Sequence, residues 1–210
     1  MAKKLIITIA RQYGSGGREI GEKVAAALNI PIYDRELITE AAAKGELNVD
    51  VAKKVDEIAA NSLLYTLAMG SNVFGTAMSF GYKMPVNDKL FLLQSDVIRD
   101  YASHGSCVFI GRCADYVLRD EPGLLRVFIH GDLDHRKARV ADRHPDVKST
   151  QIVDIINKTD RRRASYYNFY TGNKWGAYEN YDIIINSSTL GIEESAKMIA
   201  GFAKMRMEEE

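Results

Sequence analysis

The sequence has little cysteine and little proline, and it has no excess of charge of either sign. Its 210 residues include two cysteines and four histidines without metal-ligand spacing, so neither a disulfide framework nor a metal centre is expected. The 28 basic and 28 acidic side chains balance, which argues against nucleic acid as a partner. No apolar run reaches the length of a membrane span, and no signal peptide is evident. These absences predict a soluble, cytoplasmic protein with no membrane partner.

What the sequence does contain is typical of one globular domain, with 46% hydrophobic and 27% charged residues. Short runs rich in β-branched and aromatic residues predict buried strands at 5–10, 30–33, 107–111, 125–130 and 181–186. Amphipathic patterns predict helices at 18–28, 35–43, 50–68, 88–103, 132–143, 149–167 and 191–206. This alternation indicates a three-layer α/β/α fold around a five-stranded parallel sheet.

A glycine-rich turn, GSGGRE at Gly14–Glu19, joins the first predicted strand to the first predicted helix. Glycines at this place let the backbone turn sharply and direct successive N–H groups at one point, where the helix dipole adds positive potential. The turn therefore suits a phosphate group. The alternative is a tight strand-to-helix connection, which also uses glycine.

The turn departs from the usual nucleotide-binding loop G-x-x-x-x-G-K-[ST]. If Gly14-Ser15-Gly16 takes the G-x-G part, Arg11 stands at the first glycine, Gly17 at the lysine, and Glu19 at the Mg²⁺-binding hydroxyl. Arg18 or Arg11 would then have to supply the missing positive charge, as a guanidinium instead of an ammonium. A carboxylate at Glu19 would repel a triphosphate unless a metal lay between them or the side chain turned away.

Five separated segments resemble the cytidylate kinase-like family of P-loop nucleoside monophosphate kinase relatives. They read IARQYGSGGREIGEKVAAALNIPIYDRELI, FIGRCADYVL, VFIHGDLDHRKARV, DRRRASYYNFYTGNKWG and YDIIINSSTLGIEESAKMI, in the family's order. The resemblance implies a P-loop NTPase fold, ATP and Mg²⁺ as cofactors, and a small nucleotide as substrate. It implies phosphorylation of a pyrimidine monophosphate, CMP or dCMP.

The resemblance also implies a division of the single domain. A core would comprise about 1–34, 104–147 and 178–210, an acceptor-binding insertion about 35–103, and a lid about 148–177. The glycine- and aromatic-containing loop at 70–87 would either bind the acceptor or form a dimer contact. A homo-oligomer is therefore one of the arrangements left open.

Two acceptor-side positions follow from the family pattern. IGRCAD keeps the family's Gly111 and Arg112 but has Cys113 in place of the aspartate, for which Asp115 is the nearby substitute. Arg112 lies at the carboxyl end of a predicted strand, where α/β sheets bind ligands, although a surface ion pair is the alternative. Asp34 matches the acceptor-site aspartate, and it fits a helix N-cap equally well.

The predicted lid carries the densest basic run, RRR at 161–163. Asp160 and Arg163 match the family's D-x-x-R, in which the arginine reaches the transferring phosphate. Successive helical residues are about 100° apart, so at most two of the three arginines can face a site. A basic run on a solvated helix face is the alternative. On the preceding helix, Arg139 shares one face with Arg136 and Arg143, and we expect it to contact the donor nucleotide.

These expectations favour a phosphotransferase in which Arg18, Arg112 and Arg163 are catalytic. The loop from Gly14 to Arg18 would cradle the donor phosphates, while Arg112 and Asp34 hold the acceptor. Two alternatives stay open: a regulatory module that binds a nucleotide without transferring phosphate, and a kinase of a different small acceptor.

Overall fold

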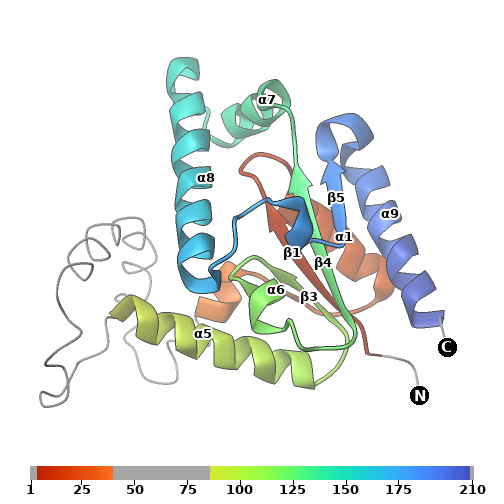
Figure 1. Ribbon diagram of the computed structural model, residues 1–210. Coiled ribbons are helices and arrows are strands. Elements are labelled where there is room, and N and C mark those ends of the chain that lie inside the picture. The colour runs from red at the N-terminus through yellow and green to blue at the C-terminus, as the bar shows by residue number, and fades with distance from the viewer. Residues whose placement is uncertain (1–3, 40–85, 209–210) are drawn as a thin grey trace, which may run out of the picture.

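A computed structural model of the protein describes residues 4–39 and 86–208 (Figure 1). The predicted helix at 50–68 and all but the last two residues of the predicted loop at 70–87 lie outside the described residues. The role of that loop and the boundaries of the three segments therefore stay predictions.

A five-stranded parallel sheet forms the centre of the molecule, in the order β2-β3-β1-β4-β5. Its strands are β1 (Ile6–Arg11), β2 (Ile32–Tyr33), β3 (Cys107–Ile110), β4 (Leu124–His130) and β5 (Ile183–Asn186). All five strands were predicted, because a parallel strand covered on both faces needs a continuous apolar run. The predicted three-layer α/β fold is confirmed.

Helices cover both faces of this sheet and its carboxyl edge. They are α1 (Gly17–Leu28), α5 (Val86–Ser103), α6 (Ala114–Val117), α7 (Leu133–Arg143), α8 (Ser149–Thr171) and α9 (Ser187–Glu208). Figure 1 shows α1 and α9 on one side of the sheet, α5 and α6 on the other, and α7 and α8 beyond the strand ends. A short 3₁₀ helix, Tyr178–Asn180, precedes β5.

The two faces of the sheet build two separate cores because side chains alternate along each strand. In β1, Ile7 and Ile9 pack toward α1 and α9, whereas Ile6 packs toward α5 and α6, and all three are fully buried. Cys107 is buried in the second core, as predicted, and burial raises the pKa of its thiol to about 12.

The structure differs from the predicted helices in several places, and α8 ends at Thr171, four residues beyond the predicted end. The helix α6 has only four residues, too few to show a periodic pattern in the sequence. The last helix begins at Ser187, four residues before the predicted start, and changes direction at Gly191, where φ is 73°. Glycine accepts this left-handed backbone without steric cost.

Strand β1 lies between β3 and β4, so the loop that follows it emerges at the middle of the sheet. The chain leaves β1 toward β2 on one side and returns through β4 on the other. In open α/β sheets, ligands bind at the carboxyl edge where the strand order reverses in this way. The fold therefore places the glycine-rich turn, the end of β3 and the helices α7 and α8 around one position.

Candidate nucleotide and anion site

The glycine-rich turn has the geometry of an anion cradle. Gly14 (φ 81°) and Gly16 (φ 77°) have left-handed backbones, and Gly16 caps the N-terminus of the twelve-residue helix α1. Among the described residues, no acceptor takes the backbone N–H groups of Gly16, Gly17 and Arg18. Unpaired N–H groups at the start of a helix attract anions. The residues present therefore fit the phosphates of a nucleotide, and the predicted role of Gly14–Arg18 is compatible with the structure.

Arg18 does not lie over this cradle. Its guanidinium pairs with Asp34 at 2.6 Å and with Glu22 at 3.1 Å, and its side chain is 56% exposed. This placement differs from the expectation that Arg18 takes over the lysine's charge. The position assigned to Glu19 also needs correction: the residue directly after Gly17, where the motif has its hydroxyl, is Arg18.

Arg11 explains why the lysine position holds a glycine. A Cβ atom at Gly17 would lie 2.5 Å from Arg11 Cβ, so a larger residue there would displace the arginine. The guanidinium extends to Gly111, where an added Cβ would collide with Arg11 Nη1. Burial, then the charges of Arg163, Arg112 and Arg35, hold the pKa of Arg11 well below its usual value. No carboxylate of the described residues pairs with it.

Arg139 reaches the cradle from α7, and its predicted contact with the donor nucleotide stays a prediction. Its Nη2 donates to Glu19 Oε2 at 2.7 Å and lies 3.3 Å from the position that a Cβ of Gly16 would take. The Nε of Arg139 is buried and has no partner among the described residues. Glu19 is therefore neutralised from outside the loop, which removes much of its expected repulsion toward a triphosphate.

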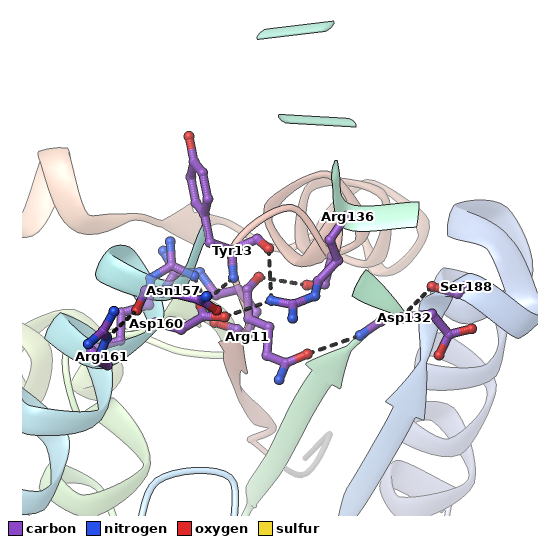
Figure 2. A network of polar contacts seen from close by, with 12 residues as sticks. Arg11, Tyr13, Asp132, Arg136, Asn157, Asp160, Arg161 and Ser188 are labelled. Carbon is purple, nitrogen blue, oxygen red and sulfur yellow. Dashed lines mark hydrogen bonds and ion pairs between the residues drawn. The ribbon is translucent and has the colours of Figure 1, made fainter. Parts of the chain in front are cut away.

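Asp160 ties α8 to the loop (Figure 2). Its carboxylate accepts a hydrogen bond from the Tyr13 backbone N–H at 2.7 Å and one from Arg136 Nη1 at 2.6 Å. The Asp160 and Arg136 side chains are only 16% and 10% exposed, and Arg136 also donates to the Tyr13 carbonyl at 3.3 Å. Asp160, predicted to bind substrate, is thus already engaged by the protein.

A pocket of about 290 Å³ opens beside the cradle, between the ends of β1 and β3 and the helix α8. Its lining is dominated by guanidinium groups, contributed by Arg11, Arg35, Arg112, Arg162 and Arg163. Three aromatic side chains, Tyr166, Tyr167 and Trp175, complete much of the wall, and Asp115 is the one acidic residue among the described residues that line it. Such a lining suits a small ligand that carries several negative charges.

The pocket's floor has an unusual backbone directly after β3. Gly111, Arg112 and Cys113 have φ values of 75°, 61° and 55°, so two non-glycine residues take left-handed conformations. Each costs about 1 to 2 kcal/mol, and such strain concentrates at binding sites. The result is that Arg112 faces the pocket, where its guanidinium lies 5.5 Å from the Tyr166 ring centre.

Asp115 lies in the pocket wall but is held by the protein. It is buried, and it accepts a hydrogen bond of 2.7 Å from the Tyr167 hydroxyl. Burial raises the pKa of its carboxyl, against the opposing effect of that hydrogen bond. Burial likewise raises the pKa of the Cys113 thiol, so this residue does not supply the negative charge of the family's aspartate.

Arg163 connects the pocket to the loop. Its Nη1 donates to the Arg11 carbonyl at 2.7 Å, and its guanidinium lies 5.6 Å from the centre of the Tyr13 ring. Burial lowers the pKa of Arg163. Arg162 also lines the pocket, whereas Arg161 is exposed and donates to the Asn157 carbonyl at 3.3 Å. The prediction that at most two of the three arginines face the site is confirmed.

Other predicted residues have structural roles or were missed. Asp34 caps the helix that begins at 35, where its Oδ1 accepts from the Leu37 N–H at 3.1 Å, so the N-cap interpretation is confirmed. Sequence reasoning did not assign Arg35 or Trp175 to the site. Trp175 comes from the segment after α8, inside the predicted lid, and it lines the pocket although no role was assigned to it.

The sequence profile of the cytidylate kinase-like family matches residues 6–189. The chain belongs to this family. No protein of curated function matches it. A crystal structure of an uncharacterized protein from Eubacterium ventriosum is 28% identical, with a TM-score of 0.69, and the match covers 96% of this chain and 99% of that one.

Two shikimate kinases of known structure share the fold. The enzyme from Bacteroides thetaiotaomicron is 15% identical with a TM-score of 0.54, covering 96% of this chain and 99% of that one. The enzyme from Acinetobacter baumannii, in complex with shikimate, is 11% identical with a TM-score of 0.52, covering 98% and 96%. Family and fold together are those of a P-loop kinase.

Two features are absent from residues 4–39 and 86–208. No cluster of three or more His, Cys, Asp or Glu side chains is arranged to hold a metal ion. No helix there combines the length and apolar character needed to cross a bilayer.

Proposed function

We propose that the protein is a phosphotransferase that moves a phosphoryl group from ATP and Mg²⁺ to a small anionic acceptor. The acceptor implied by the family is a pyrimidine nucleoside monophosphate, CMP or dCMP. The observation that carries the proposal is the cluster of guanidinium groups directly beside a glycine-rich helix N-terminus. The glycine-rich helix N-terminus binds the donor phosphates, the guanidinium cluster binds the acceptor anion, and the two meet at Arg11.

The residues divide the work by position. The N–H groups of Gly16 and Gly17 and the Arg139 guanidinium hold the donor phosphates. Arg11 and Arg163, linked at the Arg11 carbonyl, lie where the cradle meets the pocket and stabilise the charge on the moving group. Arg112 binds the acceptor. ATP brings the phosphoryl group, and its Mg²⁺ takes mainly phosphate oxygens and water as ligands, which requires no carboxylate cage.

No strong general base is needed, because the oxygen of an acceptor phosphate is already anionic. What the protein must do is align two anions that repel each other and keep water out. The guanidinium groups offset the repulsion, and α8, fastened to the loop through Asp160, covers the site.

The test is turnover of the purified full-length protein with MgATP and CMP, dCMP, UMP or AMP in turn, with nucleotides separated by ion-exchange chromatography. We expect ADP and an acceptor diphosphate to appear in equal amounts. A folded sample that yields no phosphorylated product from any of these acceptors would contradict the proposal.

A regulatory module that binds a nucleotide without transferring phosphate is the second candidate. It is favoured by the absence of a lysine and by the engagement of Asp160 with the Tyr13 N–H, which occupies one donor of the loop. In that case MgATP would raise the melting temperature while no ADP formed over hours.

A further inference from the structure

A buried glutamine on α5 has no role in the site as described so far. Gln94 is only 1% exposed, and its amide lies between α5, α8 and the helix that begins at 35. A buried amide is costly unless both of its ends are hydrogen-bonded, and an apolar side chain of similar size avoids that cost. The hydrogen bonds of Gln94 show what the amide holds in place.

These hydrogen bonds form a chain whose direction is fixed. The Thr39 hydroxyl donates to the Arg35 carbonyl at 2.7 Å, which uses its only hydrogen. Thr39 Oγ1 can therefore only accept from the amide, and it does so from Gln94 Nε2 at 3.1 Å. The amide oxygen of Gln94 then accepts from the Tyr166 hydroxyl at 3.2 Å. Reversing the amide would place its oxygen against a hydroxyl with no hydrogen left to donate.

The chain joins two walls of the arginine-lined pocket that come from distant parts of the sequence. Arg35 lines the pocket from the helix that begins at 35, and Tyr166 lines it from α8. The Arg112 guanidinium lies 5.5 Å from the centre of the Tyr166 ring, inside the same pocket. Gln94 is not among the described residues that line the pocket. It is therefore placed to fix the shape of the pocket without contacting a ligand.

A second tyrosine of α8 provides a comparison within the same helix–helix contact. The Tyr170 hydroxyl donates to Asp88 Oδ1 at 3.0 Å, so it also ties α8 to α5. Its ring stacks on Phe91 with the ring centres 4.2 Å apart. Tyr170 is not among the described residues that line the pocket, whereas Tyr166 is. The two tyrosines make the same kind of contact between helices, but only the contact of Tyr166 continues into the pocket wall.

We infer that Gln94 is a positioning residue for the ligand of this pocket, because it couples the helix that carries Arg35 to the Tyr166 ring. That this ligand is the acceptor rests on the proposed function, whereas the coupling rests on the hydrogen bonds alone. The Asp160 and Tyr170 contacts, which do not involve Gln94, still hold α8 to the loop and to α5. Loss of Gln94 should therefore weaken the binding of the acceptor and leave the binding of ATP unchanged.

The test measures the binding of CMP and of MgATP separately, by calorimetry on the full-length protein. Gln94→Leu removes both hydrogen bonds of the amide, and we expect it to weaken CMP binding about tenfold, the effect of about one hydrogen bond. MgATP should bind within about twofold of the wild type. A split between the two ligands is what a merely structural glutamine would not produce.

Two further variants assign the effect to the chain. Tyr166→Phe breaks the same link from α8 and keeps the ring, so it carries the test even if Gln94→Leu folds poorly. Because both substitutions remove one interaction, the double variant should bind CMP within about twofold of the weaker single variant. Tyr170→Phe is the matched control, since it removes the other tyrosine hydrogen bond between α8 and α5, and it should leave CMP binding within about twofold.

The inference would be overturned by a wild type that does not bind CMP, or by Gln94→Leu and Tyr166→Phe variants that bind CMP as the wild type does. Equal weakening of CMP and MgATP, or a Tyr170→Phe variant as weak as Tyr166→Phe, would also overturn it. The proposed function is judged separately, by turnover of the wild type. CMP binding that depends on Gln94 without any ADP formation would remove the kinase and leave the positioning role. Phosphorylation of CMP together with unchanged CMP binding in Gln94→Leu would do the reverse.

Discussion

Two sets of arginines surround the glycine-rich loop, and they differ in what neutralises them. Arg18, Arg136 and Arg139 each pair with a carboxylate of the chain at 2.6 to 2.7 Å. Arg11 and Arg163 lie beside the same loop, and no carboxylate of the described residues pairs with either of them. Arginine side chains therefore serve two different purposes within one site.

The difference is one between shaping a loop and binding a ligand. A paired guanidinium with well-directed hydrogen bonds fixes the backbone around it, as Arg136 and Asp160 fix Tyr13. A guanidinium surrounded by like charges destabilises the free protein and gains most when an anion arrives. The pKa values show this contrast, since that of Arg11 is lowered, by burial first, whereas that of Arg18 is raised despite some burial, chiefly by Asp34.

We call Arg18, Arg136 and Arg139 the shaping set, and Arg11 and Arg163 the binding set. The largest expected effect comes from breaking an ion pair of the shaping set. Asp160→Ala leaves the buried Arg136 guanidinium and the Tyr13 N–H without an acceptor, so we expect it to lower the free energy of unfolding by about 3 to 5 kcal/mol. Urea denaturation followed by circular dichroism measures this. Asp134→Ala, which removes an exposed partner of Lys137, is the control and should change little. Equal effects of the two substitutions would show that the Asp160 network does not hold the loop.

A substitution in the binding set should change the free energy of unfolding less, but it should strongly lower the rate of phosphoryl transfer. Arg11→Met should lower phosphoryl transfer about 100-fold, because it removes a positive charge from the junction of cradle and pocket. It should not lower stability, since it relieves repulsion from Arg163 and Arg112.

Arg18→Met is the counterpart in the shaping set, and we expect it to slow transfer less than tenfold. Initial rates of ADP formation at saturating substrates compare the two variants. If Arg18→Met were the more damaging change, the loop's working cation would be Arg18, one of the two candidates that the sequence offered.

These same residues show how much of the fold and of the site could be predicted from the sequence. The apolar runs predicted every strand of the described residues, and Arg163 of the D-x-x-R spacing contacts the end of β1, while its contact with substrate stays a prediction. The direction of Arg18 could not be predicted, because Asp34 competes for it from sixteen residues further along the chain. Nor could the sequence show that Gly17 makes room for Arg11, a contact decided by how the β1 end and the start of α1 pack.

The smallest expected effect concerns the pocket's carboxyl. Burial raises the pKa of Asp115, so the folded protein binds this proton more tightly than the unfolded chain. The resulting cost to stability is absent below the unfolded pKa and grows as pH rises toward the folded pKa. Asp115→Asn removes that cost and can still accept from Tyr167.

We therefore expect Asp115→Asn to be about 1 kcal/mol more stable than the wild type at pH 8, with a smaller difference at pH 4. Urea denaturation across this range measures it. Greater stability of the wild type at pH 8 would mean that Asp115 is a favourable ionised partner of the arginines.

The most direct measurement is a crystal structure of the protein with a non-hydrolysable MgATP analogue and CMP. The account predicts donor phosphates on the Gly16 and Gly17 N–H groups, the acceptor phosphate on Arg112, and Arg11 with Arg163 between them. The pairs Arg18–Asp34 and Arg136–Asp160 should remain intact. Phosphates bound to Arg18 with its pair to Asp34 broken, and a pocket without any anion, would contradict it.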